Sequence, residues 1–461
     1  MGPKSGVLAA VMLLACAMAA KADNTPVKGT LDTTLYHATF VKLGLQNREG
    51  ILFEPNVLGP RSRIALVFSF PRVQGTGDDE KLRELVNRGY RGFVVRTYDE
   101  HDSPYDGLRD ISAAIDYMRS LPGVEKVLVI GHSGGARQVT NYTNYAWNGP
   151  AGCQHPGLLL PCETKKVTGL AKPDGLIALD LPPGPIFSVW SLDPAYVKGN
   201  PNHENPALDM FAPANGYDPK TMAATYTPEF KKRFFAAQSA RNDQILDDAL
   251  ATLKRISKGK SDTTSDAALT VPGVVSDTDN GWVLALPDIS LMSHSKRPHT
   301  VIRTDGKIAE EIIRTTRPPL GPTGDAAHTG NSGRAFIDQL SCCAISGSIR
   351  SYLGSFGTRT TKDFAITDDD IVGVDWHSNV DSPVAALEGI RVPVLIEVNT
   401  CYRFIVSSEI AYDHTAAKDK TLVALDGALH GFTPCKPEYG DTQTRVFNYI
   451  DSWLSKSGRF L

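Results

Sequence analysis

The chain of 461 residues has a formal net charge of −3 at pH 7, and 41% of its residues are hydrophobic. This balance excludes the strongly basic surface that nucleic acid or an anionic membrane selects, and the hydrophobic fraction is ample for a folded core. We therefore expect an ordinary globular protein with no nucleic-acid partner.

The first 22 residues are typical of a signal peptide. The basic residue Lys4 precedes an apolar stretch over residues 6–20, and the tripeptide AKA ending at Ala22 is a small-residue cleavage site. The apolar stretch is shorter than the roughly 20 residues of a membrane-spanning helix, so we expect no integral membrane association. The mature chain would be secreted or periplasmic, and a lipid anchor on Cys16 is the weaker alternative.

Apart from Cys16, the chain has an even number of cysteines, which in an exported protein predicts disulfides. They are Cys153, Cys162, Cys342, Cys343, Cys401 and Cys435. The short spacing of Cys153 and Cys162 makes them the first candidate pair, and Cys401 with Cys435 is the second, although the sequence leaves the pairing open. No Cys-x-x-Cys pair with matching histidines is present, so we expect no metal site.

Strands and helices alternate along the first part of the chain. Apolar runs bounded by turn residues predict buried strands, and the segments between them have apolar residues at helical spacing. In chain order the pattern predicts a β-hairpin near 35–54, a strand over 63–70, a helix over 78–90, a strand over 92–98, a helix over 106–121, a strand over 124–130, a helix over 134–147 and a strand over 174–180. Such alternation predicts parallel βαβ units.

The alternation stops between about 184 and 370, where Pro, Gly, Ser and Asp are frequent. This region contains one long helical pattern over 228–256, with Thr227 as its cap and Pro228 in its first turn. The alternation then resumes with a strand over 392–398, a helix near 406–417, a strand over 421–427 and a helix near 442–455.

These patterns predict an α/β fold with a doubly wound, mostly parallel sheet and a large cap insertion. We expect the core to comprise residues 23–185 and 371–461, with the insertion over 186–370 at the ligand end of the sheet. The aromatic residues of the insertion either line an apolar pocket or form the core of the cap. They are Trp190, Phe211, Tyr226, Phe234, Phe235 and Trp282.

The stretch VEKVLVIGHSGGARQVT, residues 124–140, contains the pattern G-x-S-x-G around Ser133. A predicted strand precedes the serine and a predicted helix follows it, which is the context of a nucleophile elbow. In that geometry the serine lies in a strained turn that exposes its hydroxyl, and the glycines on either side let the backbone approach closely. An ordinary strand-to-helix corner is the alternative interpretation.

With this motif the chain resembles the α/β-hydrolase superfamily of serine esterases and lipases, over residues 35–185 and 371–461. The resemblance implies that nucleophile, acid and histidine follow one another along the chain. It places the general base at His430, which follows the last predicted strand in a loop bounded by Gly427 and Gly431.

The resemblance also implies two backbone N–H groups that bind an oxyanion. The first belongs to Gly134, directly after the nucleophile. The second comes from the loop after the strand over 63–70. Because Pro71 has no N–H, this donor is Phe70 or Arg72.

The acid departs from the pattern of the superfamily. Most members carry an aspartate after the strand that here is 392–398, but the next residues, NTCYRF, include no carboxylate. One candidate is Asp180 at the end of DGLIALD, a placement similar to the acid of pancreatic-type lipases; a turn or capping role is its alternative. The other candidate is Glu409, at the start of the following helix.

The resemblance implies a serine carboxylesterase or lipase-like hydrolase that forms an acyl-enzyme on Ser133, with His430 as general base. The substrate would be a small-molecule or lipid-like ester, bulky or hydrophobic, and no cofactor motif is present. The motif does not separate this enzyme from an amidase or lactonase of the same fold. A non-catalytic binding module is a further alternative, because the usual acid is missing. The sequence predicts neither the natural substrate nor the oligomeric state.

Overall fold

The structure is a computed structural model. It describes residues 23–26, 33–44, 48–69, 80–96, 103–197, 200–221, 223–258, 266–274, 287–317 and 344–461. The predicted signal peptide, Phe70, Arg72, Cys342, Cys343 and Trp282 lie outside these residues. Within them, no helix has the length and apolar character needed to cross a membrane.

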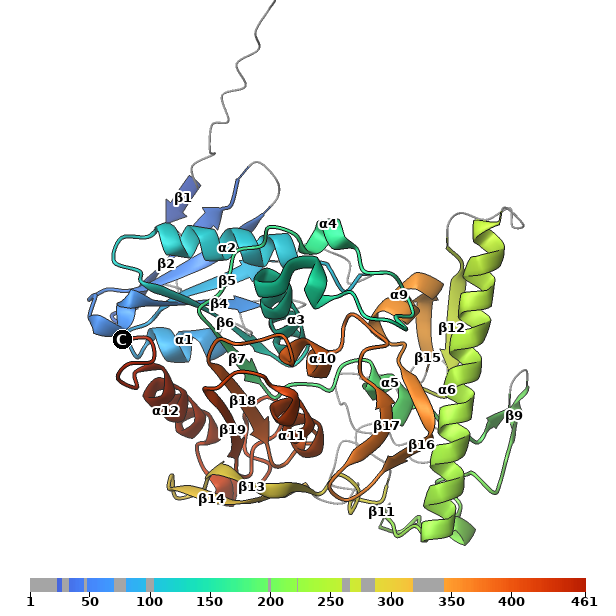
Figure 1. Ribbon diagram of the computed structural model, residues 1–461. Coiled ribbons are helices and arrows are strands. Elements are labelled where there is room, and N and C mark those ends of the chain that lie inside the picture. The colour runs from blue at the N-terminus through green and yellow to red at the C-terminus, as the bar shows by residue number, and fades with distance from the viewer. Residues whose placement is uncertain are drawn as a thin grey trace, which may run out of the picture.

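An 11-stranded sheet forms the centre of the molecule (Figure 1). Its spatial order is β1-β2-β3-β5-β4-β6-β7-β18-β19-β13-β14. The strands are β1 (Asp23–Pro26), β2 (Tyr36–Lys42), β3 (Glu49–Pro55), β4 (Ile64–Ser69), β5 (Arg91–Arg96), β6 (Lys126–His132), β7 (Gly175–Leu179), β13 (His294–Ile302), β14 (Ile308–Arg314), β18 (Val394–Asn399) and β19 (Lys420–Leu425). From β5 to β13 every neighbouring pair is parallel, and the pairs at both edges are antiparallel.

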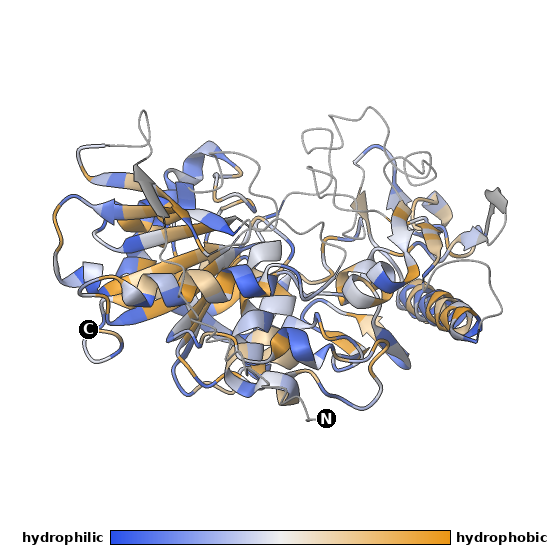
Figure 2. Cartoon of the chain, turned by 90° about the horizontal axis from the view of Figure 1, so that it is seen from above, coloured by the Kyte–Doolittle hydropathy of each residue, from blue (hydrophilic) through white to orange (hydrophobic). Residues whose placement is uncertain are grey.

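Helices cover both faces of this sheet. In β4, Ala65 and Val67 belong to one apolar cluster with α2 and α3, whereas Leu66 and Phe68 belong to a second cluster with α1 and α12. The helices of the core are α1 (Glu80–Val86), α2 (Leu108–Ser120), α3 (Gly134–Asn148), α4 (Thr164–Val167), α10 (Pro383–Leu387), α11 (Ile405–His414) and α12 (Thr442–Leu454). Because both faces of the central strands are buried, these strands are continuous apolar runs. Figure 2 shows the hydrophobic residues gathered along them. The predicted doubly wound α/β fold is confirmed.

A second group of elements lies beside the core, along the long helix α6 (Pro228–Ser257). The side chain of Thr227 caps this helix as predicted, by accepting a hydrogen bond from the N–H of Phe230 at 3.2 Å. The other elements are α5 (Ile186–Trp190), β8 (Tyr196–Val197), β9 (Asn200–Glu204), β10 (Tyr217–Asp218), β11 (Ala223–Ala224), β12 (Ala268–Pro272), β15 (Ala344–Ser348), α9 (Ile349–Ser355), β16 (Arg359–Ile366) and β17 (Ile371–Asp375).

Most of the aromatic residues considered for a pocket form the interior of this region instead. Those at most 4% exposed are Trp190, Tyr226, Phe234 and Phe235. Phe230 contacts Tyr226 and Phe234 with ring centroids 4.8 and 5.6 Å apart. Phe211 is partly buried against the same cluster. The aromatic content of the insertion therefore reflects its own core.

The expected limits of the insertion differ from the sheet that is formed. Strands β13 and β14 lie within 186–370, yet they extend the main sheet next to β19. The sequence of β13, HSKRPHTVI, has charged residues and a proline where a central strand would be apolar. It is adjacent to the antiparallel edge strand β14, and such a position tolerates polar side chains.

Candidate active site

Ser133 lies in the sharp turn between β6 and α3. Its backbone φ of 56° is in the left-handed region, which non-glycine residues rarely adopt. The turn is held by a 3.0 Å hydrogen bond from the N–H of Ser133 to the carbonyl oxygen of Leu179. A Cβ at Gly131 would lie 2.4 Å from the backbone of Gly135, so this close approach requires glycine. The geometry is that of a nucleophile elbow, with a half-buried serine at its apex.

His430 lies in the loop after β19, directly beside this elbow. Its ring centroid is 4.6 Å from that of His132, the residue before Ser133. The Nε2–H of His132 donates a 2.8 Å hydrogen bond to the carbonyl oxygen of His430. Burial, together with the nearby charges of His430 and Lys81, holds the pKa of His132 well below its usual range. His132 is therefore a neutral ring that packs against His430.

Asp180 is the residue that the structure brings to His430. Its Oδ2 lies 2.5 Å from His430 Nδ1, and its side chain is fully buried. It directly follows β7, has a φ of 44°, and accepts a 3.3 Å hydrogen bond at Oδ1 from the N–H of Asn399. Parallel strands β7 and β18 are neighbours, so the turns after them meet at one edge of the sheet. Asp180 thereby supplies a carboxylate beside His430, whereas the turn after β18 carries Asn399.

A second buried carboxyl group lies behind Asp180. Glu397 in β18 is 0% exposed, and it accepts the N–H of Asp180 twice, at its carbonyl oxygen (2.9 Å) and at Oε2 (3.2 Å). Burial and the charge of Asp180 raise the pKa of Glu397 well above its usual range. Glu397 was not among the predicted site residues, although a carboxylate inside the apolar run VPVLIEV could have indicated a functional group.

The alternative acid, Glu409, has other partners. It accepts hydrogen bonds from the N–H groups of Lys296 (2.6 Å) and Arg297 (3.1 Å), and His299 Nε2 is 2.8 Å from its Oε1. Burial opposes ionisation of this carboxyl, but the hydrogen bonds from His299 and from the backbone outweigh it and lower the pKa of Glu409. Glu409 thus joins α11 to β13, and the structure does not place it against His430.

The turn after β18 contributes aromatic side chains where an acid was expected. Tyr402 stacks on His430 with ring centroids 4.5 Å apart, and Phe404 meets the same ring edge-on at 5.9 Å. The guanidinium of Arg403 lies over the rings of both aromatic residues and donates to Tyr402 Oη at 2.9 Å. These contacts fix one face of the His430 ring. The sequence analysis missed them because stacking between separate loops leaves no local pattern.

Two disulfides match the two candidate pairs. Cys401 and Cys435, with Cα atoms 6.4 Å apart, join the turn after β18 to the loop that carries His430. Cys153 and Cys162, with Cα atoms 5.7 Å apart, close a short loop after α3. The first of these disulfides holds Tyr402 and His430 on covalently linked segments.

Of the predicted oxyanion donors, only Gly134 is among the described residues. Gly134 is the first residue of α3, directly after Ser133, whereas Phe70 and Arg72 lie outside the described residues. Ser69, the last residue of β4, is buried and donates a 2.6 Å hydrogen bond to Gln138 Oε1 in α3. This bond anchors the start of the loop expected to supply the second donor.

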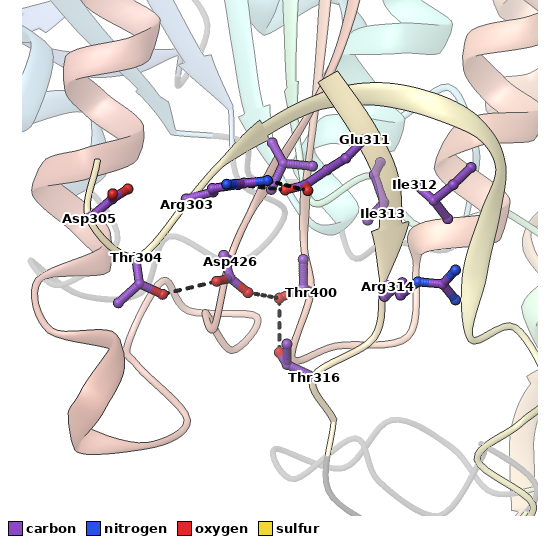
Figure 3. Close-up of a pocket in the computed structure, with 11 residues that line it drawn as sticks. Arg303, Thr304, Asp305, Glu311, Ile312, Ile313, Arg314, Thr316, Thr400 and Asp426 are labelled. Atoms are coloured by element: carbon purple, nitrogen blue, oxygen red, sulfur yellow. Dashed lines mark hydrogen bonds and ion pairs between the residues drawn. The ribbon is translucent and has the colours of Figure 1, made fainter. Parts of the chain in front are cut away.

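A pocket of about 570 Å³ lies at the β13–β14 edge of the sheet (Figure 3). Thr304 and Thr400 both donate to Asp426, at 2.9 and 3.4 Å, and Arg303 forms two hydrogen bonds with Glu311. None of Ser133, Asp180 and His430 lines this pocket. The hydrogen bonds of this pocket join β14 and the turn after β19 to the end of β13, and we assign it no catalytic role. In the part of the chain that is described, no group of His, Cys, Asp or Glu is arranged to hold a metal ion.

Comparison of the chain with protein-family models and with curated proteins finds no match. Its structure is similar to several solved structures. They include a soluble variant of monoglyceride lipase from Saccharomyces cerevisiae with a substrate analog (12% identity, 94% of this chain and 99% of that chain, TM-score 0.39). They also include monoacylglycerol lipase from Paleococcus ferrophilus (16%, 88% and 97%, 0.34) and Est1E from Butyrivibrio proteoclasticus (10%, 90% and 97%, 0.36). At these identities and TM-scores the likeness carries no argument about the site, which is argued below from this chain's own residues.

Proposed function

We propose that this protein is a secreted serine hydrolase that cleaves a carboxylic ester, with Ser133 as nucleophile, His430 as general base and Asp180 as the orienting acid. The observation that carries the proposal is the 2.5 Å contact between His430 Nδ1 and Asp180 Oδ2, directly beside the strained turn of Ser133. A serine at a strand-to-helix elbow has few structural reasons to be accompanied by a histidine and a buried carboxylate.

Each group has a defined role in the proposed reaction. His430 takes the proton of the Ser133 hydroxyl at Nε2 while Oγ bonds to the ester carbonyl carbon, and backbone N–H groups including that of Gly134 bind the oxyanion. The C–O bond to the alcohol then breaks, and the alcohol leaves with the proton from His430. Water attacks the acyl-enzyme by the same steps and releases the carboxylic acid. Asp180 keeps the Nδ1 proton of His430 in place and stabilises the imidazolium.

The proposed substrate is a small-molecule or lipid-like ester. Tyr402 and Phe404 make the surroundings of His430 apolar, since both rings contact it. The two disulfides support an oxidising compartment, in agreement with the predicted signal peptide.

Hydrolysis of p-nitrophenyl esters of graded chain length tests the proposal. The chain from Asp23 onward should turn over these esters, and Ser133→Ala should lower kcat by about 10⁶-fold, which is the loss expected when a triad serine is removed. The chain-length profile reports how much of the acyl group the site accommodates. A folded Ser133→Ala variant with undiminished activity would show that the proposal is wrong.

A further inference from the structure

Glu397 and Asp180 carry two buried carboxyl groups, and Glu397 accepts the backbone N–H of Asp180. Both are 0% exposed, and Glu397 lies in the central strand β18, opposite Leu179 of β7 and Val423 of β19. Glu397 Oε2 is 3.2 Å from the nitrogen of Asp180, and Glu397 Oε1 has no hydrogen-bond partner among the described residues. The mechanism proposed above uses Asp180 and assigns nothing to Glu397.

The partners of the two carboxyl groups differ. Asp180 receives His430 at Oδ2 and the N–H of Asn399 at Oδ1. Glu397 faces no cation within hydrogen-bond distance in the described part of the chain, and its neighbour is itself an acid. Two carboxylates that lie near each other in the buried interior cannot both be ionised without a large cost in free energy. Burial and the charge of Asp180 therefore favour the neutral form of Glu397.

The contact also acts on the backbone of Asp180. Its φ of 44° is in the left-handed region, which is unfavourable for a residue with a side chain. The two acceptors of Glu397 hold this N–H, and the turn in this conformation directs Oδ2 to His430. Without the side chain of Glu397, this buried N–H keeps only the carbonyl oxygen as acceptor, and the turn loses one restraint.

We propose that Glu397 is a positioning residue of the candidate triad: in its neutral form it holds the turn of Asp180 through the backbone N–H and adds no second negative charge beside His430. The proposal rests on the proposed function. A neutral group at this place matters because a second carboxylate would stabilise the imidazolium in the resting protein, and His430 would then be a poor base at neutral pH.

The test compares Glu397→Leu, Glu397→Gln and a control, Glu409→Gln. Leucine removes the side-chain acceptor, so kcat should fall about 10- to 100-fold with little change in KM, as for other small misplacements of a catalytic group. The acid limb of the kcat/KM profile should move to lower pH as the carboxylate of Asp180 moves away from His430. Glutamine keeps a neutral acceptor and should restore most of the lost kcat and the original acid limb. Glu409→Gln, which changes a buried carboxyl bonded to His299, should leave both unchanged.

An NMR titration of the His430 imidazole, in a Ser133→Ala background, gives a readout that needs no turnover. Its pKa should be the same with Glu397 and with Glu397→Gln. A Gln variant as slow as the Leu variant would show that a neutral acceptor at this place is not sufficient, and a His430 pKa lowered by Glu397→Gln would show that Glu397 is charged; either result would overturn the proposal. So would a Leu variant with wild-type kcat. If Glu397→Leu does not fold, Glu397→Met replaces it. If wild-type protein hydrolyses no ester, the proposed function fails, and the titration still decides the charge of Glu397.

Discussion

The turns after β7 and β18 lie next to each other at one edge of the sheet, but their side chains differ in kind. The first carries the buried carboxylate of Asp180, and the second carries Asn399 followed by the aromatic residues that pack on His430. Because neighbouring parallel strands end at the same edge, an acid on either turn can reach a histidine from the loop after β19. The comparison indicates that the candidate acid must lie at the carboxyl ends of these neighbouring strands, but that it need not follow one particular strand.

Removing the carboxylate from the first turn should have the largest effect. Asp180→Asn should lower kcat by about 10⁴-fold, because an amide cannot stabilise the imidazolium of His430 or hold its neutral ring in the correct tautomer. The steady-state turnover of a p-nitrophenyl ester measures this loss. The matched control is Glu409→Gln, which should retain wild-type kcat. Equal losses in the two variants would contradict the assignment of the acid.

Moving the carboxylate to the second turn should recover part of this loss. In the double variant Asp180→Asn with Asn399→Asp, kcat should rise by about tenfold above Asp180→Asn alone, since residue 399 lies beside His430 but lacks the optimal geometry. At present Asn399 Nδ2 is 3.5 Å from the carbonyl oxygen of His430. The same assay measures the recovery. A double variant as inactive as Asp180→Asn would show that the two turns are not interchangeable.

The disulfide on the second turn should have a smaller effect on turnover and a clear effect on stability. Cys401→Ala with Cys435→Ala should lower the free energy of unfolding by about 2–4 kcal/mol and reduce kcat, because the loops of Tyr402 and His430 lose their covalent link. Urea unfolding and ester turnover measure the two effects. The control pair, Cys153→Ala with Cys162→Ala, should lose roughly 1 kcal/mol less, because its loop is shorter, and keep its kcat. A larger kcat loss in the control pair than in the first would be inconsistent with this account.

The smallest effect on activity is expected at Glu409. Its pKa is lowered in the folded protein, so its contribution to stability is present above the usual glutamate pKa and is lost as the pH falls through the folded pKa. Glu409→Gln should reduce the free energy of unfolding by about 1–3 kcal/mol at pH 7, where hydrogen bonds to the charged group are lost. The difference from wild type should shrink toward pH 4 and below. Urea unfolding at a series of pH values checks this, and a difference that grows at low pH would show the wrong sign.

Much of the core could be predicted from the sequence, because buried strands such as IALVFS are continuous apolar runs between turn signals. The strand β13 was not separated from the insertion, since its charged residues and its proline interrupt the apolar pattern that predicts an inner strand. Of the candidate site, Ser133 and His430 follow from local motifs, and Asp180 was left open against Glu409. The choice between these two acids depends on which strands are neighbours and on which carboxyl group bonds to His299. Both depend on the tertiary structure and leave no local sequence pattern.

The most direct measurement is the rate at which a fluorophosphonate labels Ser133 in wild-type protein, Asp180→Asn and Glu409→Gln, followed by intact mass and peptide mapping. The account predicts one label on the peptide that contains Ser133, equal rates for wild type and Glu409→Gln, and a rate at least about 100-fold lower for Asp180→Asn. No label on wild-type Ser133, or equal labelling of Asp180→Asn, would contradict a triad of Ser133, His430 and Asp180.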